Sequence, residues 1–234
     1  MKIGLFADPH YSDKTTPSSN RCHALSYDKI NDAMLYFKNE KVDLVICLGD
    51  LTDDCIDVSD NPKALGKLSR MIDSFGIKFY SLMGNHDCLS FTNEEFDILT
   101  NGAYPPFKIE ADTSTLIFLD ANYLDNGEKY KKGDIDWTNT FLPNEQIKAL
   151  KQELKSDKNK YVFVHQNIDN TVEENHIIHN ADKIRELLEN ASNVKMVIQG
   201  HYHNGKDSEI NGIKYHTLRA MCEGVDNYYE IIEI

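Results

Sequence analysis

Metal-ligating residue types follow five apolar segments of this sequence. The five motifs, in chain order, are Asp8-Pro9-His10, Gly49-Asp50-Leu51-Thr52-Asp53, Gly84-Asn85-His86-Asp87, His165 at the end of 161–165, and Gly200-His201-Tyr202-His203. Alone, Asp8, Asp50 and the Asn-His-Asp segment are more often turns or helix caps, and a D-x-H or H-x-H pattern is usually accidental. His165 alone would more often be a hydrogen-bonded core histidine than a ligand. Together they predict a metal site, because carboxylates at the edge of an apolar sheet are costly to bury unless they are paired or bind a cation.

The donor types in these motifs restrict the metal and the chemistry. The candidate ligands are Asp8, His10, Asp50, Asn85, His165, His201 and His203. They include no cysteine thiolate, which favours Mn, Fe or Zn as the metal. Seven ligands are too many for one tetrahedral ion and suit two divalent ions about 3.5–4 Å apart that share a carboxylate. Such a pair binds phosphoryl oxygens and lowers the pKa of a bridging water, which predicts hydrolysis of a phosphate ester by the resulting hydroxide.

Alternating strands and helices would bring the five motifs together. Apolar, β-rich runs predict strands at 2–7, 43–48, 77–82, 115–120, 161–165, 195–199, 213–218 and 228–234. Helical periodicity predicts helices at 24–39, 62–75, 93–99, 143–155 and 181–190. The first three strands are continuous apolar runs separated by helices, as in buried parallel sheets, and the last two are expected to be antiparallel. Ligand sites form at the carboxyl ends of such strands, so the motifs are expected to share one crevice.

Composition limits the classes of protein to consider. The 234 residues include 25 Lys and Arg against 38 Asp and Glu, a net charge of −13, which disfavours binding to long nucleic acids. A single domain over 1–234 is expected because no internal repeat or linker is visible. No apolar run approaches the roughly 20 residues of a membrane helix, and no leader pattern precedes the first strand. The five cysteines form no C-x-x-C pair, so reduced thiols, a cytoplasmic location and no membrane association are expected.

The ordered motifs resemble those of the calcineurin-like metallophosphoesterase superfamily, from Asp8 to His203. The resemblance implies an α/β fold of two packed, mixed β-sheets flanked by helices in four layers (α/β/β/α). It implies two metal positions that share Asp50 as a bridging ligand. The first position would be held by Asp8, His10, Asp50 and His203. The second would be held by Asp50, Asn85, His165 and His201.

Several segments are most similar to one part of that superfamily, the manganese-dependent ADP-ribose/CDP-alcohol diphosphatases and related cyclic-nucleotide phosphodiesterases. The segments are 8–11, 21–26, 119–122, 200–205 and 212–215. The resemblance implies hydrolysis of a phosphodiester or diphosphate bond in a small, nucleotide-like substrate. A phosphomonoesterase with the same site is one alternative, and a non-catalytic binding module on the same fold is another. The binding module is disfavoured because no motif residue is lost. The oligomeric state is left open.

Two residues beside the ligands are candidates for catalysis. His86 is expected to donate a proton to the leaving oxygen, or a hydrogen bond to the oxyanion of the transition state, and Asp87 is expected to orient it. Both residues could instead lock the orientation of the metal ligands. Asp53 could accept a hydrogen bond from a ligand histidine or cap the loop that follows it.

Four further residues are candidate substrate contacts because they lie near the motifs or in long loops. They are Tyr11, Arg21, His23 and Asn122. A solvated loop charge is an equal alternative for Arg21, and a packing role is an equal alternative for the aromatic residues. His176 and His179 form an i, i+3 pair outside the motifs and are expected at the surface or on a lid.

Overall fold

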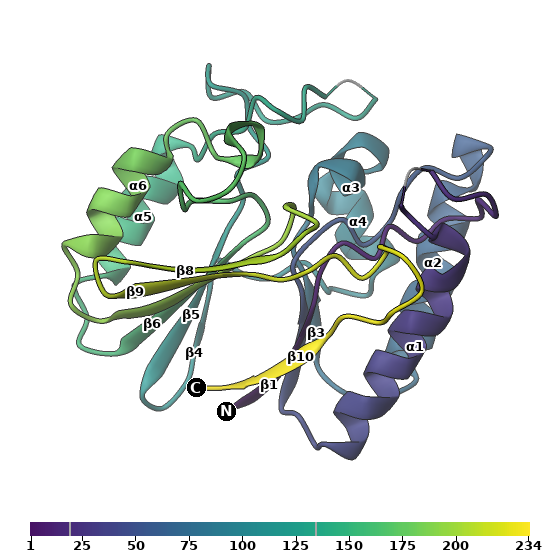
Figure 1. The fold of residues 1–234 in the computed structure, drawn as a ribbon, viewed down its shortest axis with the longest axis horizontal. Coiled ribbons are helices and arrows are strands. Elements are labelled where there is room, and N and C mark those ends of the chain that lie inside the picture. Colours follow the sequence, from purple (N-terminus) through teal and green to yellow (C-terminus); the bar gives the residue numbers. More distant parts are fainter. Residues whose placement is uncertain (19, 134) are drawn as a thin grey trace.

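Two β-sheets pack face to face and carry helices on their outer faces in the computed structural model, which describes residues 1–18, 20–133 and 135–234 (Figure 1). This arrangement confirms the predicted four-layer fold. Among the described residues, no helix is long and apolar enough to cross a bilayer. All five cysteines are free thiols.

The first sheet has four strands in the order β10-β1-β2-β3. Strands β1 (Lys2–Phe6), β2 (Leu44–Cys47) and β3 (Phe79–Ser81) are parallel, and β10 (Glu230–Glu233) pairs antiparallel with β1. The helices of this half are α1 (His23–Asn39), α2 (Asn61–Asp73), α3 (Asn85–Ser90) and α4 (Asn93–Leu99), with a short 3₁₀ turn at Val58–Asp60. The parallel order places the loops after β1, β2 and β3 at one end of the sheet.

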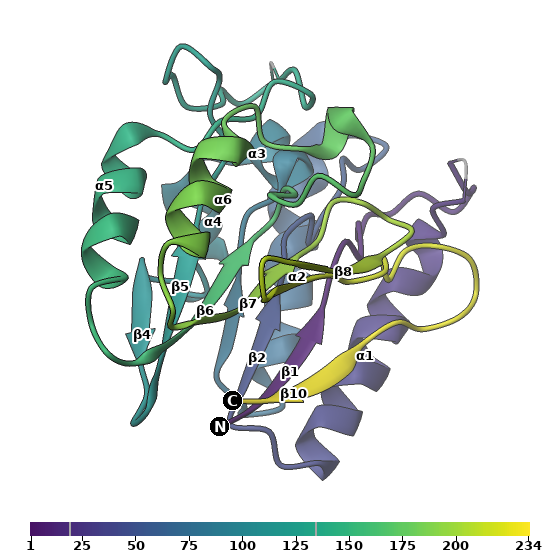
Figure 2. The ribbon, with the colours of Figure 1, turned by 60° about the vertical axis from the view of Figure 1, so that its left-hand side comes forward.

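The second sheet has six strands in the order β4-β5-β6-β7-β9-β8. Its strands are β4 (Lys108–Glu110), β5 (Ser114–Leu119), β6 (Asn159–Val164), β7 (Val194–Gln199), β8 (Lys206–Ile210) and β9 (Ile213–Thr217). The four central strands, β5, β6, β7 and β9, run parallel, and the edge strands β4 and β8 are antiparallel. Helices α5 (Asn144–Glu153) and α6 (Ala181–Glu189) cover the outer face, and a 3₁₀ turn lies at Glu174–His176 (Figure 2).

Three hydrophobic layers hold the four structural layers together. Alternate residues of β1 point in opposite directions, so Ile3 and Leu5 pack against the second sheet while Phe6 packs towards α1. The layer between the sheets includes Phe118 and Phe163, whose rings stack with centroids 5.2 Å apart. The apolar residues of α5 and α6 (Ile147, Leu150, Ile184 and Leu188) face inward against the second sheet, as helical periodicity requires.

The C-terminal segment crosses from one sheet to the other, which corrects the expectation for the last two strands. Strand β9 pairs with β7 and β8, whereas β10 pairs with β1, so the two belong to different sheets. Between them, the backbone N–H of Met221 donates to Ala7 (2.8 Å) and that of Cys222 donates to Asp8 (3.1 Å). The buried ammonium of Lys29 donates to the carbonyl of Met221 (2.7 Å). The segment is therefore tied to the loop that follows β1.

Strands β4 and β8 and helix α3 are absent from the sequence-based expectation. The two strands are short edge strands with exposed polar residues, and α3 has only six residues. None of them carries the apolar periodicity on which strand and helix prediction depends.

A histidine on β9 joins the edges of the two sheets. The ring of His216 contacts Asp207 on β8 and Glu230 on β10, the latter with Nε2 2.6 Å from Oε1. Burial opposes protonation, but the two carboxylates outweigh it and raise the pKa of His216 to about 9. Because folding raises this pKa, protonated His216 stabilises the folded state. The stabilisation is fully present below the pKa of His216 in the unfolded chain, about 6.5, and is lost as the pH rises through 9.

We therefore expect His216→Gln to lower the free energy of unfolding by about 1 kcal/mol at pH 6 and by much less at pH 10. Urea titrations of wild type and variant in chelator-containing buffer at both pH values measure the difference. His179→Gln, at an exposed histidine, is the matched control. An equal loss at pH 6 and pH 10 would contradict the ionic role.

Candidate metal centre

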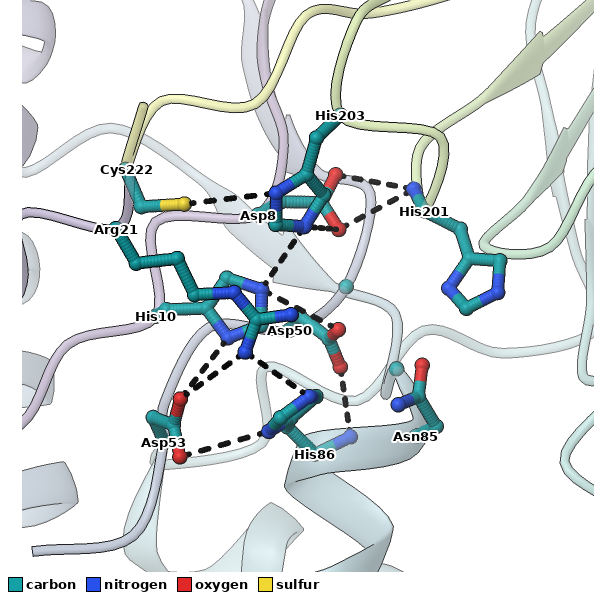
Figure 3. A network of polar contacts seen from close by, with 12 residues as sticks. Asp8, His10, Arg21, Asp50, Asp53, Asn85, His86, His201, His203 and Cys222 are labelled. Atoms are coloured by element: carbon teal, nitrogen blue, oxygen red, sulfur yellow. Dashed lines mark hydrogen bonds and ion pairs between the residues drawn. The ribbon is translucent and has the colours of Figure 1, made fainter. Parts of the chain in front are cut away.

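The seven predicted ligands come together at one edge of the sandwich. Asp8 and His10 follow β1, Asp50 follows β2, and Asn85 opens α3 just after β3. His165 follows β6 in the second sheet, and His201 and His203 follow β7. Six of the seven are labelled in Figure 3, where their side chains turn towards a common centre. The site thus lies where the loops of both sheets meet.

One group of side chains surrounds His10. Its Nε2 lies 3.2 Å from Nε2 of His203 and 3.5 Å from Oδ2 of Asp50. Nε2 of His203 is also 3.9 Å from Oδ1 of Asp8. The nitrogen lone pairs and carboxylate oxygens of this group therefore face one small region.

A second group lies on the other side of Asp50. Nε2 of His165 is 3.5 Å from Oδ2 of Asp50 and 3.2 Å from Oδ1 of Asn85. Ligand atoms of Asp50, His165 and His201 all lie within 4.8 Å of one another. The carboxylate of Asp50 is common to the two groups, which is the arrangement that a bridging ligand requires.

Hydrogen bonds at the outer nitrogens orient the ligand rings. Nδ1 of His165 donates to the carbonyl of Leu48 (2.8 Å), and Nδ1 of His203 lies 2.7 Å from Oε1 of Glu223. Burial opposes protonation of His165, but the carboxylates of Asp50 and Asp8 outweigh it and raise the pKa of this ring to about 9. With a proton fixed on Nδ1, it is the Nε2 proton that a cation would displace, and the ring then presents its Nε2 lone pair to the centre. These contacts therefore select the tautomer that a metal ligand needs.

The local backbone is strained at the same place. In the described ranges, four ligand residues have positive φ angles, namely Asp8 (51°), His10 (48°), Asp50 (49°) and His201 (66°). Such conformations cost non-glycine residues of order 1–3 kcal/mol and concentrate at functional sites. A Cβ on Gly84 would lie 2.5 Å from the backbone nitrogen of Asp50, so only glycine lets the loops after β2 and β3 approach this closely.

The electrostatics of the donor set fit a bound cation. The carboxylates of Asp8 and Asp50 are buried, at 0% and 2% exposure, and burial raises the pKa of Asp8. Burial also lowers the pKa of His10 and His201 well below the ordinary value, which keeps both imidazoles neutral. Nε2 of His201 is buried with no hydrogen-bond partner among the described residues. Two divalent cations sharing Asp50 would compensate the buried carboxylates and occupy the lone pairs.

His86 lies beside the ligand groups and is 23% exposed. Its Nδ1 is 3.5 Å from Oδ1 of Asp53, and its Nε2 is 3.2 Å from Nη1 of Arg21 (Figure 3). Burial disfavours the imidazolium, but the carboxylates of Asp50 and Asp53 outweigh this effect and raise the pKa of His86. The residue is therefore a reachable acid with a positioned partner.

Asp87 does not orient His86, which corrects that expectation. Its buried carboxylate accepts hydrogen bonds from the backbone N–H groups of Leu51 (3.0 Å), Thr52 (2.9 Å) and Gly84 (3.0 Å). These bonds tie the loop after β2 to the start of α3. The carboxylate that faces the His86 ring belongs to Asp53.

One of the four predicted substrate contacts lines the cavity at the centre. The cavity has a volume of about 280 Å³ and is lined by Arg21, Asp50, Asn85, His86, Trp137, His176, His201 and His203. Tyr11, His23 and Asn122 are buried outside this lining, which corrects the expectation for them. The ring of Tyr11 packs against Tyr27, and Nδ1 of His23 donates to the carbonyl of His10 (2.8 Å). The amide of Asn122 donates to the carbonyl of Met83 (2.8 Å).

Trp137 and His176 line the cavity although the sequence analysis did not place them there. His176 was expected at the surface or on a lid, and Trp137 carries no motif. The available signals were that Trp137 is the sole tryptophan of the chain and that it lies in an unusually long loop before α5.

Comparison with known proteins agrees with the fold and the centre. The calcineurin-like phosphoesterase family model matches residues 1–205. A probable cyclic nucleotide phosphodiesterase of Psychrobacter arcticus is 23% identical over 224 residues, which cover 90% of this chain and 74% of the relative. The structure of a dimetal phosphatase from Danio rerio has a TM-score of 0.82 at 17% identity, over 98% of this chain and 91% of that one. The structure of a putative 5′-nucleotidase from Staphylococcus aureus has a TM-score of 0.59 at 13% identity, over 94% of this chain and 48% of that one.

The family model covers most of the chain, and the carboxylate of Asp50 lies between two groups of side chains that could hold a metal ion. The chain therefore belongs to the calcineurin-like phosphoesterase family and is a metal-dependent phosphoric ester hydrolase.

Proposed function

We propose that this enzyme hydrolyses a phosphodiester or diphosphate bond in a small, nucleotide-like substrate. The observation that carries the proposal is the contact between Nη1 of Arg21 and Nε2 of His86, 3.2 Å apart at the wall of the cavity. Both groups also face the carboxylate of Asp53, with Nη1 of Arg21 3.4 Å from Oδ2 and Nδ1 of His86 3.5 Å from Oδ1. If His86 is protonated, its Nε2 proton meets the guanidinium, which is another donor, and not an acceptor. An anionic oxygen placed between them would accept from both, which makes this wall a phosphate site.

We propose Mn, Fe or Zn as the metals, with the ligands divided as the two groups suggest. Asp8, His10, Asp50 and His203 would hold one ion. Asp50, Asn85, His165 and His201 would hold the other. The ions would polarise the phosphoryl oxygens and lower the pKa of a bound water. Two divalent ions would contribute a charge of +4 and the carboxylates of Asp8 and Asp50 a charge of −2, so the local charge would be +4 − 2 = +2. The site would therefore attract a phosphate ester although the protein as a whole is acidic.

The chain's own residues would then handle the leaving group. His86 would donate a proton from Nε2 to the leaving oxygen, with Asp53 holding the ring through Nδ1. The guanidinium of Arg21 would bind a non-bridging phosphate oxygen in the same wall. A cavity of about 280 Å³ accommodates a small ester, and with the net charge of −13 it disfavours long nucleic acids as substrates.

Hydrolysis of bis-p-nitrophenyl phosphate beside p-nitrophenyl phosphate tests the proposal. The protein is stripped with chelator and reloaded with Mn²⁺. We expect chelation to abolish turnover, Mn²⁺ to restore it, and the diester to be the better substrate. An Asp50→Asn preparation purified in parallel measures contaminating phosphatases. A preference for the monoester would favour a phosphomonoesterase, and absence of metal-dependent turnover of either ester would contradict the proposal.

The relative from Psychrobacter arcticus, named a probable cyclic nucleotide phosphodiesterase, supports cyclic nucleotides as the first natural esters to test. ADP-ribose and CDP-alcohols follow, because they carry a diphosphate between a nucleoside and a second alcohol.

A further inference from the structure

An aromatic wall lines one side of the metal centre. It consists of Trp137, in the loop between β5 and α5, and His176, at the end of the 3₁₀ turn at Glu174–His176. The centroid of the Trp137 ring lies 5.6 Å from that of His201 and 5.4 Å from that of His176. His176 in turn lies 5.2 Å from Tyr202, nearly perpendicular to it. The wall therefore packs directly against one candidate ligand, His201.

The aromatic wall and the proposed phosphate site at Arg21 and His86 lie beside different groups of candidate ligands. Arg21 and His86 lie beside His10, whereas Trp137 and His176 contact His201, and Figure 3 shows Arg21 and His201 at opposite sides of the centre. The cavity thus offers charged donors at one side and flat rings at the other. A ligand that spans both sides needs an anionic end and a flat, apolar end.

The backbone on either side of Trp137 is held by hydrogen bonds although the indole is exposed. Trp137 is 39% exposed, which is unusual for so large an apolar side chain. The hydroxyl of Tyr130 donates to the carbonyls of Asp136 (3.2 Å) and Asn139 (2.9 Å), on either side of the tryptophan. The carboxylate of Asp136 accepts from the backbone N–H of Thr138 (3.1 Å). An exposed ring on a fixed loop beside a reactive centre is suited to bind a ligand.

We propose that Trp137, backed by His176, stacks against the flat ring of the substrate's nucleoside or aryl group and so selects ring-bearing esters. The inference rests on the proposed function, because it assigns the part of the substrate that is not attacked. Stacking of a base on an aromatic side chain changes affinity by roughly 5- to 150-fold. Ring size and flatness, rather than a pattern of hydrogen bonds, would set the preference.

The matched ligands adenosine 5′-monophosphate and ribose 5-phosphate test the stacking, since they differ only by the base. Trp137 is the sole tryptophan, so fluorescence of the Zn²⁺-loaded enzyme excited beyond the absorption of its twelve tyrosines reports on this residue alone. We expect adenosine 5′-monophosphate to quench the emission and ribose 5-phosphate to leave it unchanged. Excitation at the red edge of the indole band avoids absorption by the base. Equal effects of the two ligands would overturn the proposal.

Substitutions separate stacking from a structural role. By calorimetry, Trp137→Ala should weaken binding of adenosine 5′-monophosphate roughly 5- to 150-fold and change binding of ribose 5-phosphate by less than about twofold. Trp137→Phe should recover part of the difference. If Trp137 only positions His201, the metal content and the affinity for both ligands will fall together, which would overturn the proposal.

Failure of this inference is distinguishable from failure of the proposed function. If adenosine 5′-monophosphate binds more tightly than ribose 5-phosphate but no ester is hydrolysed, the proposed function is wrong and the aromatic binding site is supported. Hydrolysis with equal binding of the two ligands would do the reverse.

Discussion

Asp50→Asn is expected to remove metal binding and turnover together. The asparagine keeps the size of the side chain and an oxygen that can accept the hydrogen bond from the backbone N–H of His86 (2.8 Å). It replaces with an amide the oxygen that lies 3.5 Å from both His10 and His165. Burial opposes ionisation of Asp50, yet neighbouring histidines hold its pKa well below the ordinary value, so the native residue supplies a full negative charge.

Loss of this charge and of the second donor oxygen should weaken metal binding by more than about 100-fold. Removing only a residue that hydrogen-bonds to a metal ligand weakens metal binding by up to about 100-fold, and loss of the ligand itself should cost more. Metal analysis of the reloaded protein and thermal unfolding with and without Mn²⁺ measure the effect, because a metal at 100 times its Kd stabilises the fold by about 2.7 kcal/mol. Asp32→Asn, an exposed aspartate on α1, makes the same change in net charge and should behave as wild type. A variant that binds two ions normally would refute Asp50 as the bridging ligand.

His86→Asn should retain both metals and lose roughly 10²- to 10⁴-fold in kcat, the usual contribution of a positioned acid. The backbone N–H of His86 still donates to Asp50, so the ligand geometry is preserved. Only the imidazole between Asp53 and Arg21 disappears. Because the pKa of His86 is raised, wild type should keep the acid form above pH 6.5 and lose turnover as the pH rises through that higher pKa.

Metal content and a pH–rate profile from pH 6 to 10 check this prediction. The alkaline decline in rate assigned to His86 should be missing in the variant, while the ion content stays at the wild-type value. His179→Asn, at an exposed histidine, controls for the loss of a histidine elsewhere. A variant with wild-type kcat would show that His86 is not the acid.

The convergence of the candidate ligands was predictable because each motif depends on local information. Asp50 and His201 directly follow glycines at the ends of apolar strands, and the carboxyl ends of neighbouring strands must meet. The parallel β-α-β units were predictable for the same reason, since an apolar run and the helix after it are visible in a short window. The face-to-face packing of the sheets came from the family resemblance rather than from periodicity.

Contacts between distant loops were not predictable from the sequence. Asp87 directly follows His86 in the sequence and was expected to orient it. Only the fold shows that the Asp87 carboxylate accepts from backbone N–H groups and that Asp53 faces the His86 ring. His23 and Asn122 have polar side chains of the kind that bind substrates, but the folded chain turns them towards backbone carbonyls. The approach of Trp137 to His201 depends on the path of a long loop, which has no periodic signal.

The crossing segment between β9 and β10 also has a consequence for folding kinetics. It bonds Met221 and Cys222 to the loop after β1, and the backbone N–H of His201 bonds to Asp8 across 193 positions of sequence. Contacts of such long range form late, because the loop they close must first lose its entropy. A growing chain on the ribosome therefore assembles the centre only after its last strands emerge, and metal capture should coincide with the final folding step. In refolding experiments, metal uptake should lag behind the recovery of helical circular dichroism.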